Sequence, residues 1–280
     1  MKALIRKHTP KAVWKGLAKS RDWALDSAES VLGMQEEMIP PRHLRGYIGS
    51  GDYRAVGEEF LGYFQRLCDL QPNHRVLDMG CGIGRMAVPL TEYLSPQGSY
   101  EGIDIVPEGI EWCSAHITRK YPNFRFQLAD VFSKYYNSGS KTNASNYRFP
   151  FLDNSFDLVF LTSVFTHMLP DEVANYLGEL KRVLKPGGKS LISWLMLNGE
   201  SATLVKGGKA ALDVSHPLGE CLVMNPKVPE EAIAYPEGKI LELYGQAGFM
   251  IEPPIRYGAW CGRASYMSFQ DICIASKPEL

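Results

Sequence analysis

The decapeptide VLDMGCGIGR, residues 76–85, joins a short apolar run to a turn that has glycine at every second position. The run ends at Asp78, and Gly80, Gly82 and Gly84 follow it. Because glycine has no Cβ atom, such a turn lets a ligand approach the backbone closely and reach the N–H groups at the start of the next helix. The stretch therefore predicts a β-strand, a ligand-binding turn and a helix.

The spacing of the glycines does not by itself identify the ligand. The dinucleotide fingerprint G-x-G-x-x-G, counted from Gly80, requires glycine where the chain has Arg85; counted from Gly82 it meets Ala87, which the fingerprint allows. Asp104 ends the next apolar run, where a carboxylate can accept hydrogen bonds from ribose hydroxyls, each contributing roughly 1.5 to 3 kcal/mol in a sheltered site. The pattern predicts an adenosine-containing ligand; a simple strand-end cap is the alternative role of Asp104.

Short apolar runs alternate with helix-like segments beyond residue 76. The apolar runs are RVLDMG, SYEGIDI, FRFQLAD, FDLVFLTSV and KSLISWLML, and the helix-like segments are RMAVPLTEYL, PEGIEWCSAHITRKY and DEVANYLGELKRVL. This order indicates a parallel sheet with helices on both faces. KPGG, at 185–188, is expected to end the last of these helices. Two later strand candidates, IEPPIRYG and QDICIASK, have no long helix between them, so we expect the sheet to finish with an antiparallel pair.

The composition narrows the class of protein. The chain has 280 residues, 45% of them hydrophobic, and a formal net charge of −1, so one large α/β domain with additions is expected, without general attraction to nucleic acid or an anionic membrane. Its six cysteines include no C-x-x-C pair, which fits neither a zinc site nor a disulfide scaffold. We find no long apolar segment. We therefore expect a cytoplasmic protein with reduced thiols, no metal and no integral membrane association.

Four motifs in order make the chain similar to class I S-adenosylmethionine-dependent methyltransferases. They are VLDMGCGIG, GIDIVPEGIEWC, QLADVF and SFDLVFLTSVFTHML, the last leading to ELKRVLKPGG, and together they span about residues 60–197. The resemblance implies a Rossmann-like, doubly wound α/β fold with a mostly parallel seven-stranded sheet and an antiparallel last strand. It also implies S-adenosyl-L-methionine as the cofactor and S-adenosyl-L-homocysteine as the product.

The resemblance also assigns cofactor contacts. They are Asp78, Gly80, Cys81, Gly82, Gly84, Asp104, Ile105, Asp130, Val131, Thr162 and Ser163. Asp104 would hold the ribose and Asp130 the exocyclic amine of adenine, although an acid in the position of Asp130 can also cap a helix or begin a turn. Cys81 is expected to be a small loop residue rather than a reactive thiol, since nothing near it in sequence supplies a base.

Methyl transfer needs little catalytic machinery. Holding the acceptor, methyl group and sulfur in line supplies roughly 7 to 11 kcal/mol, and a general base adds about 10²- to 10⁴-fold. The candidate base is His167 in TSVFTHMLP, just past the fourth strand, where the ends of parallel strands form the ligand crevice. The alternative is that His167 only shapes the loop by bonding a backbone carbonyl. The same alternative applies to Thr166, a tentative substrate contact.

Three segments exceed the minimal fold and are expected to determine the acceptor. They are an N-terminal helical extension at 1–50 and, within the methyltransferase domain at 51–280, insertions at about 133–150 and 198–236. The first insertion carries the tentative substrate contacts Tyr135, Tyr136 and Tyr147, and it is either a lid or an ordered surface loop. The second insertion is expected to form a roof over the acceptor pocket.

The N-terminal extension contains a predicted amphipathic helix. Thr9 and Pro10 mark its start and Gly33 its end. Its apolar stripe consists of Trp14, Leu17, Leu25, Ala28 and Leu32. We expect this stripe to pack on the protein's own domain; the lysines and arginines that precede Asp22 without an intervening acid leave a membrane-surface or polyanion role as the alternative.

The function expected from these observations is methyl transfer from S-adenosylmethionine to a small molecule, with oxygen as the first choice of acceptor atom. A nitrogen or carbon acceptor, a noncatalytic S-adenosylmethionine-binding protein and an NAD-dependent oxidoreductase are the alternatives. The chain lacks the aromatic-and-basic pattern of RNA readers and has no N-P-P-Y motif after the fourth strand, so no nucleic-acid partner is expected.

Overall fold

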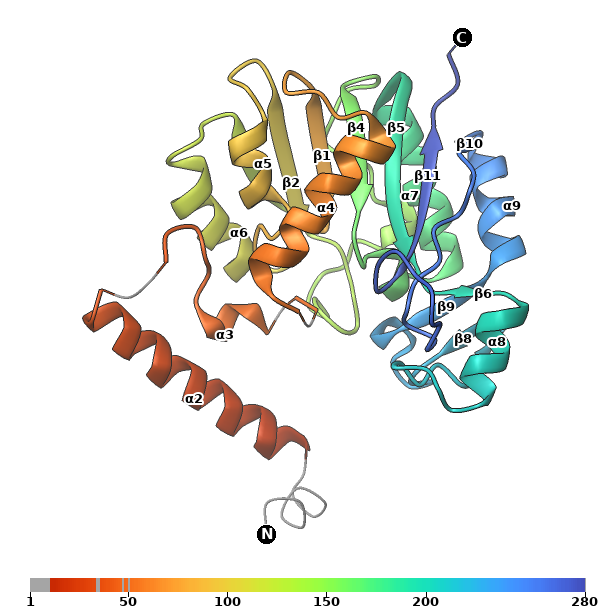
Figure 1. Ribbon diagram of the computed structural model, residues 1–280, viewed down its shortest axis with the longest axis horizontal. Coiled ribbons are helices and arrows are strands. Elements are labelled where there is room, and N and C mark those ends of the chain that lie inside the picture. The colour runs from red at the N-terminus through yellow and green to blue at the C-terminus, as the bar shows by residue number, and fades with distance from the viewer. Residues whose placement is uncertain (1–10, 34–35, 47, 50, 280) are drawn as a thin grey trace.

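A seven-stranded sheet forms the centre of the computed structural model, which describes residues 11–33, 36–46, 48–49 and 51–279 (Figure 1). The strands are β1 (Arg75–Met79), β2 (Ser99–Asp104), β3 (Phe124–Leu128), β4 (Phe156–Leu161), β5 (Leu184–Trp194), β10 (Met250–Ile251) and β11 (Asp271–Ser276). They lie in the order β10-β11-β5-β4-β1-β2-β3. Strands β1 to β5 pair in parallel, and β11 runs antiparallel to both β5 and β10. The predicted sheet, with its antiparallel last strand, is confirmed.

Helices cover both faces of this sheet. On one face lie α4 (Tyr53–Cys68), α5 (Ala87–Tyr93) and α6 (Pro107–Cys113), which continues into the π-helical turn η1 (Ser114–Thr118); on the other lie α7 (Pro170–Val183) and α9 (Glu237–Ala247) (Figure 1). Successive side chains of a strand point to opposite faces. Val76 accordingly joins the apolar core under α4 and α5, whereas Leu77 joins the core under α7 and α9. Burial on both faces explains why the central strands β1 and β4 are mostly apolar.

Helix α7 is the helix that the DEVANYLGELKRVL segment predicts. Val173, Leu177 and Leu180 are fully buried against the sheet, in agreement with their helical spacing. The helix ends at Val183, two residues before Lys185 begins KPGG, and the residues of KPGG lie in the first part of β5. The end of the helix thus brings the chain straight into the next parallel strand.

The insertion at 198–236 contributes to a second, smaller sheet at one end of the large one (Figure 1). Its strands are β6 (Met196–Leu197), β7 (His216–Leu218), β8 (Cys221–Val223) and β9 (Ile233–Pro236), in the order β6-β9-β8-β7, with α8 (Gly199–Lys206) and the 3₁₀ turn η4 (Pro229–Glu231) beside them. The buried carboxylate of Asp271 ties this unit to β11, since it accepts hydrogen bonds from Met196 N and from Trp260 Nε1. The sequence indicated a roof here but not a sheet.

The N-terminal extension lies apart from the α/β body as helix α2 (Lys11–Val31), followed by the short α3 (Arg42–Arg45) (Figure 1). Thr9 and Pro10 and the side chains of Trp14 and Leu17 lie outside the described residues, and Gly33 follows the helix in the left-handed conformation. In the described part, Leu25 and Leu32 are exposed and Ala28 with them. The expectation that this part of the stripe packs on the protein's own domain is wrong, because α2 docks through its opposite, polar side.

Two further features concern the chain as a whole. All six cysteines fall within the described residues, and each is buried and unpaired. Among the helices that the structure describes, none combines the length and the apolar character needed to cross a bilayer.

Candidate functional site

The glycine turn lies between the carboxyl ends of β1 and β2. Its first two N–H groups, those of Gly80 and Cys81, both donate to the carbonyl oxygen of Ile103, at 2.7 and 3.0 Å. Gly80 has a φ of +93°, which side-chain-bearing residues rarely adopt, and a Cβ atom there would overlap Cγ2 of Val164. The predicted need for glycine at this position is therefore explained by both conformation and space.

Asp104 closes the turn from the end of β2. Its Oδ2 accepts a hydrogen bond from Gly82 N at 2.7 Å, and its Oδ1 accepts one from Val106 N at 2.9 Å. Burial raises the pKa of this carboxyl, while the three backbone N–H groups of Gly82, Val106 and Ile105 oppose the rise. Asp104 is thus a strand-end cap, and each of its oxygens keeps a lone pair with which to accept from a ribose hydroxyl.

Asp78 and Cys81 lie beneath the turn. Asp78 is fully buried; Tyr100 Oη donates to its Oδ2 at 2.6 Å, and its Oδ1 has no partner among the described residues. Burial raises the pKa of Asp78 to about 8, helped by the nearby charge of Asp104 and opposed by the Tyr100 hydroxyl. Burial likewise raises the pKa of the Cys81 thiol, which keeps it protonated and inert, as its predicted role in the loop requires.

The remaining predicted cofactor residues follow β2, β3 and β4 at the same edge of the sheet. Ile105 and Thr162 are half-buried, Val131 is buried, and Asp130 is exposed. Parallel neighbouring strands deliver their carboxyl ends to a common edge, so this placement agrees with one elongated ligand crossing several strand ends. Gly84 lies deeper, at the start of the segment that leads into α5.

Ser163 is held in a small network that the sequence did not reveal. Its φ is +62°, its N–H donates to Ser193 Oγ at 2.7 Å, and its Oγ accepts from Gln270 Nε2 at 2.9 Å. Ser193 Oγ in turn donates to Gln270 Oε1 at 2.6 Å. The three residues come from segments far apart in the chain, so no local pattern could have grouped them. The network holds Ser163 in a backbone conformation that is uncommon for a residue other than glycine.

His167 ends the 3₁₀ turn η3 (Phe165–His167) and lies against the roof insertion. Its Nδ1 is 2.8 Å from the carbonyl oxygen of Glu230. A carbonyl oxygen can only accept, so Nδ1 carries a proton. Burial lowers the pKa of His167, with the backbone contacts to Glu230 and Glu231 opposing it, so the ring is neutral near pH 7 and Nε2 carries the lone pair. The sequence-based alternative, a carbonyl contact that shapes the loop, is therefore present, and it leaves the ring competent as a base.

Two tyrosines of the first insertion flank His167. The ring centroids of Tyr135 and Tyr136 lie 6.3 and 5.5 Å from that of His167, the first ring parallel to it and the second perpendicular. Burial raises the pKa of Tyr136 to about 12, and the charges of Tyr135 and Asp104 add to this. Tyr136 therefore lies beside His167 and within the electrostatic influence of Asp104.

The two insertions touch each other beside this aromatic group. Lys134 Nζ donates to the carbonyl oxygen of Lys227 at 2.6 Å. The first insertion also folds on itself, with an isolated bridge between Ser133 and Asn137. The first insertion is therefore joined to the second by a hydrogen bond, and its predicted role beside the acceptor stays a prediction.

Tyr147 and Thr166 lie differently from the other predicted substrate contacts. Tyr147 is half-buried and packs near Phe149 and Tyr176 of the core, with ring centroids 6.0 and 6.4 Å away. Thr166 is buried, with its Oγ1 3.4 Å from Ser163 Oγ. Their surroundings favour structural roles for both, and their contact with a substrate stays a prediction.

The chemistry of these groups fits S-adenosylmethionine. Asp104, at the end of β2, offers acceptor oxygens to a diol, and the buried Asp78 beneath the turn keeps one oxygen without a partner among the described residues. The described residues contain no group of three or more side chains that could hold a metal ion. The arrangement can thus bind an adenosyl group along the strand ends and present a neutral imidazole to a second molecule.

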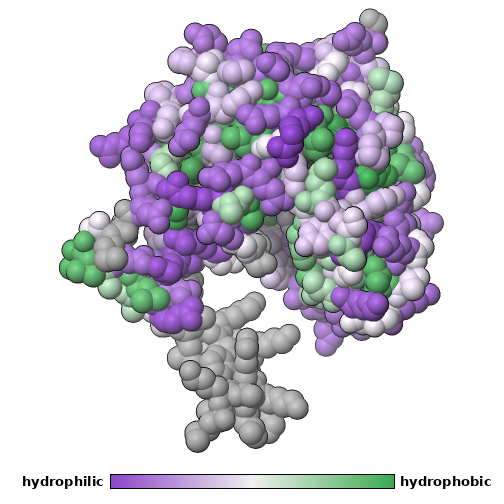
Figure 2. Space-filling view, in the orientation of Figure 1, coloured by the Kyte–Doolittle hydropathy of each residue, from purple (hydrophilic) through white to green (hydrophobic). Residues whose placement is uncertain are grey.

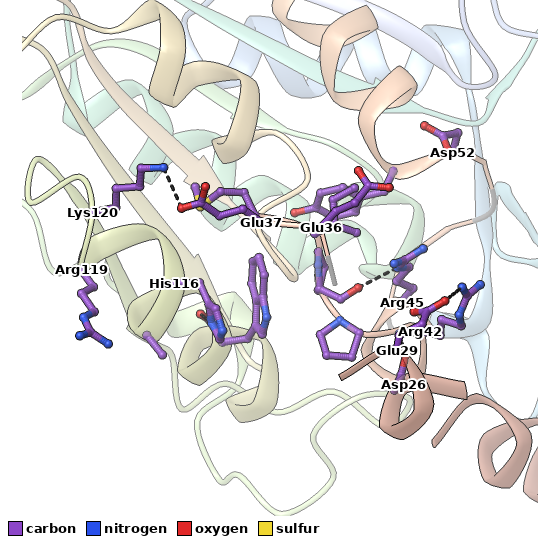
Figure 3. A pocket seen from close by; sticks show the side chains of 17 residues that line it. Asp26, Glu29, Glu36, Glu37, Arg42, Arg45, Asp52, His116, Arg119 and Lys120 are labelled. Atoms are coloured by element: carbon purple, nitrogen blue, oxygen red, sulfur yellow. Dashed lines mark hydrogen bonds and ion pairs between the residues drawn. The ribbon is translucent and has the colours of Figure 1, made fainter. Parts of the chain in front are cut away.

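A separate pocket of about 760 Å³ lies outside this edge of the sheet, between the segment around 36–53 and helix α6 (Figure 3). It contains none of the predicted site residues. Several of its charged side chains are paired within the pocket, including Glu37 with Lys120 and Glu29 with Arg42. Asp52, which borders it, accepts from Ala55 N and so caps α4. These contacts give the segment a structural role beside the glycine turn. Tyr53 Oη joins the two, since it donates a hydrogen bond to the carbonyl oxygen of Ile83 in the turn.

Comparisons with known proteins agree with this geometry. Residues 76–188 match the family model described as a methyltransferase domain. An uncharacterised methyltransferase of Schizosaccharomyces pombe is 37% identical over 121 residues, which are 41% of this chain and 37% of that protein. A phosphoethanolamine N-methyltransferase of Triticum aestivum is 29% identical over 53% of this chain and 25% of its own length. A solved S-adenosylmethionine-dependent methyltransferase from Methanosarcina mazei, 22% identical, superposes with a TM-score of 0.52 over 75% of this chain and 95% of its own.

The chain thus spans well under half the length of these two curated relatives. The family model extends from β1 into β5 and so includes the glycine turn, Asp104 and His167. The solved structure supports the fold alone.

Proposed function

Because residues 76–188 form a class I S-adenosylmethionine-dependent methyltransferase domain, we propose that the protein transfers the methyl group of S-adenosylmethionine to a hydroxyl oxygen of a small molecule. The observation that carries the choice of oxygen is the state of His167. Its protonated Nδ1 is engaged by the Glu230 carbonyl, and its neutral Nε2 can accept a proton. A hydroxyl acceptor benefits most from such a base, because its own pKa is high.

Each residue has a definite task in this proposal. The glycine turn and Asp104 orient the adenosyl group, which supplies an electrophilic methyl on a sulfonium when bound. The acceptor oxygen forms the new bond to carbon as the bond from carbon to sulfur breaks, leaving the neutral thioether. His167 Nε2 takes the hydroxyl proton, and the Glu230 carbonyl stabilises the charged ring that results. Tyr136 stays protonated, since its pKa is about 12, and can orient the acceptor by a hydrogen bond.

The aromatic surroundings support a small acceptor with an apolar or aromatic body. Tyr135 and Tyr136 are partly exposed and stand beside His167, where they offer ring faces and hydroxyls to one molecule. The predicted cofactor contacts, including Asp130, Thr162 and Ser163, and the predicted substrate contacts remain part of this proposal.

Other acceptors are the competing hypotheses. Relatives are named as a phosphoethanolamine N-methyltransferase, a sterol 24-C-methyltransferase and a tRNA N(3)-methylcytidine methyltransferase. An ammonium acceptor would also use a base at His167, so nitrogen is the second candidate. The absence of a nucleic-acid partner and a cytoplasmic location stay predictions.

The experiment is to incubate the purified protein with methyl-labelled S-adenosylmethionine and small-molecule extracts, and to identify the labelled product by mass spectrometry and NMR. A methyl carbon with the chemical shift of a methoxy group is the expected result. A labelled N-methyl or C-methyl product, or label found only in RNA, would replace the oxygen proposal.

A His167→Gln variant serves as the matched control. Its side-chain amide can still donate to the Glu230 carbonyl but has no basic nitrogen. Labelled product is expected to fall sharply, while binding of S-adenosylhomocysteine, measured by calorimetry, stays unchanged.

A further inference from the structure

Helix α2 is attached to the body by its polar side. Asp26 is buried, and its two carboxylate oxygens accept from the backbone N–H groups of Arg42 and His43, at 2.8 and 3.1 Å. His43 Nδ1 lies 2.7 Å from Asp26 Oδ2, and the ring of Trp23 stacks on that of His43 with centroids 4.0 Å apart. Glu29 also pairs with Arg42. These contacts fix which side of α2 faces the protein.

The opposite side of α2 is apolar and exposed. Leu25, Ala28 and Leu32 recur at helical spacing, and the side chains of the two leucines are 44% and 69% exposed. Val31, at the helix end, is 87% exposed. Figure 2 shows apolar side chains gathered at this end of the helix, on the left of the view. In the sequence, the same face continues backwards through Arg21 to the apolar residues Leu17 and Trp14.

The charge along the extension is strongly uneven. All its charged residues before Asp22 are basic, and they are Lys2, Arg6, Lys7, Lys11, Lys15, Lys19 and Arg21. The rest of the protein balances them, since the formal net charge of the chain is only −1. A positively charged segment continuous with an apolar helix face matches a surface that is negatively charged outside and apolar beneath.

We propose that α2 lies on an anionic lipid surface, with Leu25, Ala28 and Leu32 inserted at the boundary between headgroups and acyl chains, and that the basic sequence before Asp22 supplies the positive charge that the lipid phosphates attract. The attachment is peripheral, because the helix is amphipathic and stays docked to α3 through Asp26. The proposal rests on the extension alone and is independent of the methyl acceptor.

A second copy of the chain fits the apolar face less well. In a parallel pair the basic segments would repel each other. In an antiparallel pair, the basic segment of each copy would need unpaired acidic side chains near the end of the other copy's helix. Those acids are already paired within the chain: Glu29 with Arg42, Glu36 with Arg54 and Glu37 with Lys120.

The test is sedimentation of the full chain with two kinds of vesicle, one of phosphatidylcholine alone and one of phosphatidylcholine and phosphatidylserine in equal parts. We expect binding to the second kind only, weakening as salt is added. Lys15→Gln should lower the partition coefficient about fivefold, since a basic residue near an anionic surface contributes about 1 kcal/mol. Leu25→Ser with Leu32→Ser should lower it at least tenfold, because both side chains leave the apolar layer.

Leu152→Ser is the matched control, since Leu152 is 82% exposed but lies on the α/β body. It should bind vesicles as the unaltered protein does. Calorimetry with S-adenosylhomocysteine checks that every variant keeps its fold. Three results would overturn the proposal: no binding to anionic vesicles, equal loss in the Leu152→Ser protein, or size-exclusion chromatography that shows a dimer dissociated by the double leucine variant.

Discussion

The two sides of the candidate site are built in different ways. On the adenosyl side, the contacts come from backbone groups and one acid within residues 78–106, and they are close in sequence. On the acceptor side, His167 is held by Glu230, 63 positions away, and Lys134 of the first insertion by Lys227, 93 positions away. The first side is a local device and the second is an assembly of insertions. Short-range contacts can be predicted from sequence and shared among relatives. Contacts between distant insertions determine the substrate specificity of the individual protein.

Removal of the base on the acceptor side should have the largest effect. We expect His167→Ala to lower kcat about 10²- to 10⁴-fold while the affinity for S-adenosylmethionine changes little. In the unaltered protein the acid limb of the kcat/KM profile should lie below pH 6.5, because burial lowers the pKa of His167 and the ring must be neutral to accept a proton. Steady-state kinetics between pH 5 and pH 9 on the identified acceptor measure both quantities.

His167→Gln decides what that loss means. If the glutamine variant recovers most of the turnover, the histidine acts only by holding the roof through the Glu230 carbonyl. If it is as slow as the alanine variant and its acid limb has disappeared, the ring is the base. Either result separates the acceptor side from the adenosyl side, since neither variant should change the affinity for S-adenosylmethionine.

The adenosyl side should be most sensitive at Gly80. Gly80→Ala places a Cβ atom against Val164 Cγ2 at a φ of +93°, so we expect about 2 to 4 kcal/mol of destabilisation from overlap and backbone strain together. Adding Val164→Ala should recover only the overlap part, because the backbone strain remains. Chemical denaturation of the two single variants and the double variant measures the coupling. A purely additive double variant would contradict the steric explanation.

The sequence predicted the large sheet and the adenosyl side because their signals are local. Gly80 directly follows β1 and Asp104 ends β2, with only helix α5 between these strands, and α7 shows its buried face in Val173, Leu177 and Leu180. The second sheet was missed, since its strands are only two to four residues long and show no periodicity. No local pattern links His167 to Glu230 either.

The prediction of which side of α2 faces the protein was wrong for a related reason. An apolar stripe indicates a buried face, but it does not say what covers that face. The contacts that orient the helix are polar and join Asp26 to backbone N–H groups 16 and 17 positions further along the chain. Hydrophobic periodicity therefore found the helix and misassigned its covered side.

A smaller effect is expected at Asp104. Asp104→Asn should weaken S-adenosylhomocysteine binding about 10- to 100-fold, the equivalent of one lost charge-assisted contact. Because Asp104 also accepts from Gly82 N and Val106 N, the variant alone cannot separate ribose binding from loop order. A 2′-deoxyribose analogue of S-adenosylhomocysteine makes the separation by calorimetry. It should bind the unaltered protein more weakly than the parent compound, and the variant should lose this preference; a preference retained by the variant would assign Asp104 to the loop alone.

The smallest expected effect lies where the two insertions meet. Lys134→Met keeps the apolar stem but removes the ammonium that donates to the Lys227 carbonyl, an exposed contact worth about 1 kcal/mol or less. The first insertion is then held less tightly to the second. The KM for the acceptor should therefore rise about two- to fivefold, while kcat and cofactor affinity stay constant. Lys141→Met, in the same insertion and also exposed, is the control and should change neither constant. A rise in the dissociation constant of S-adenosylmethionine in Lys134→Met would contradict the separation of the two sides. It would mean that a contact between the insertions affects cofactor binding at the glycine turn.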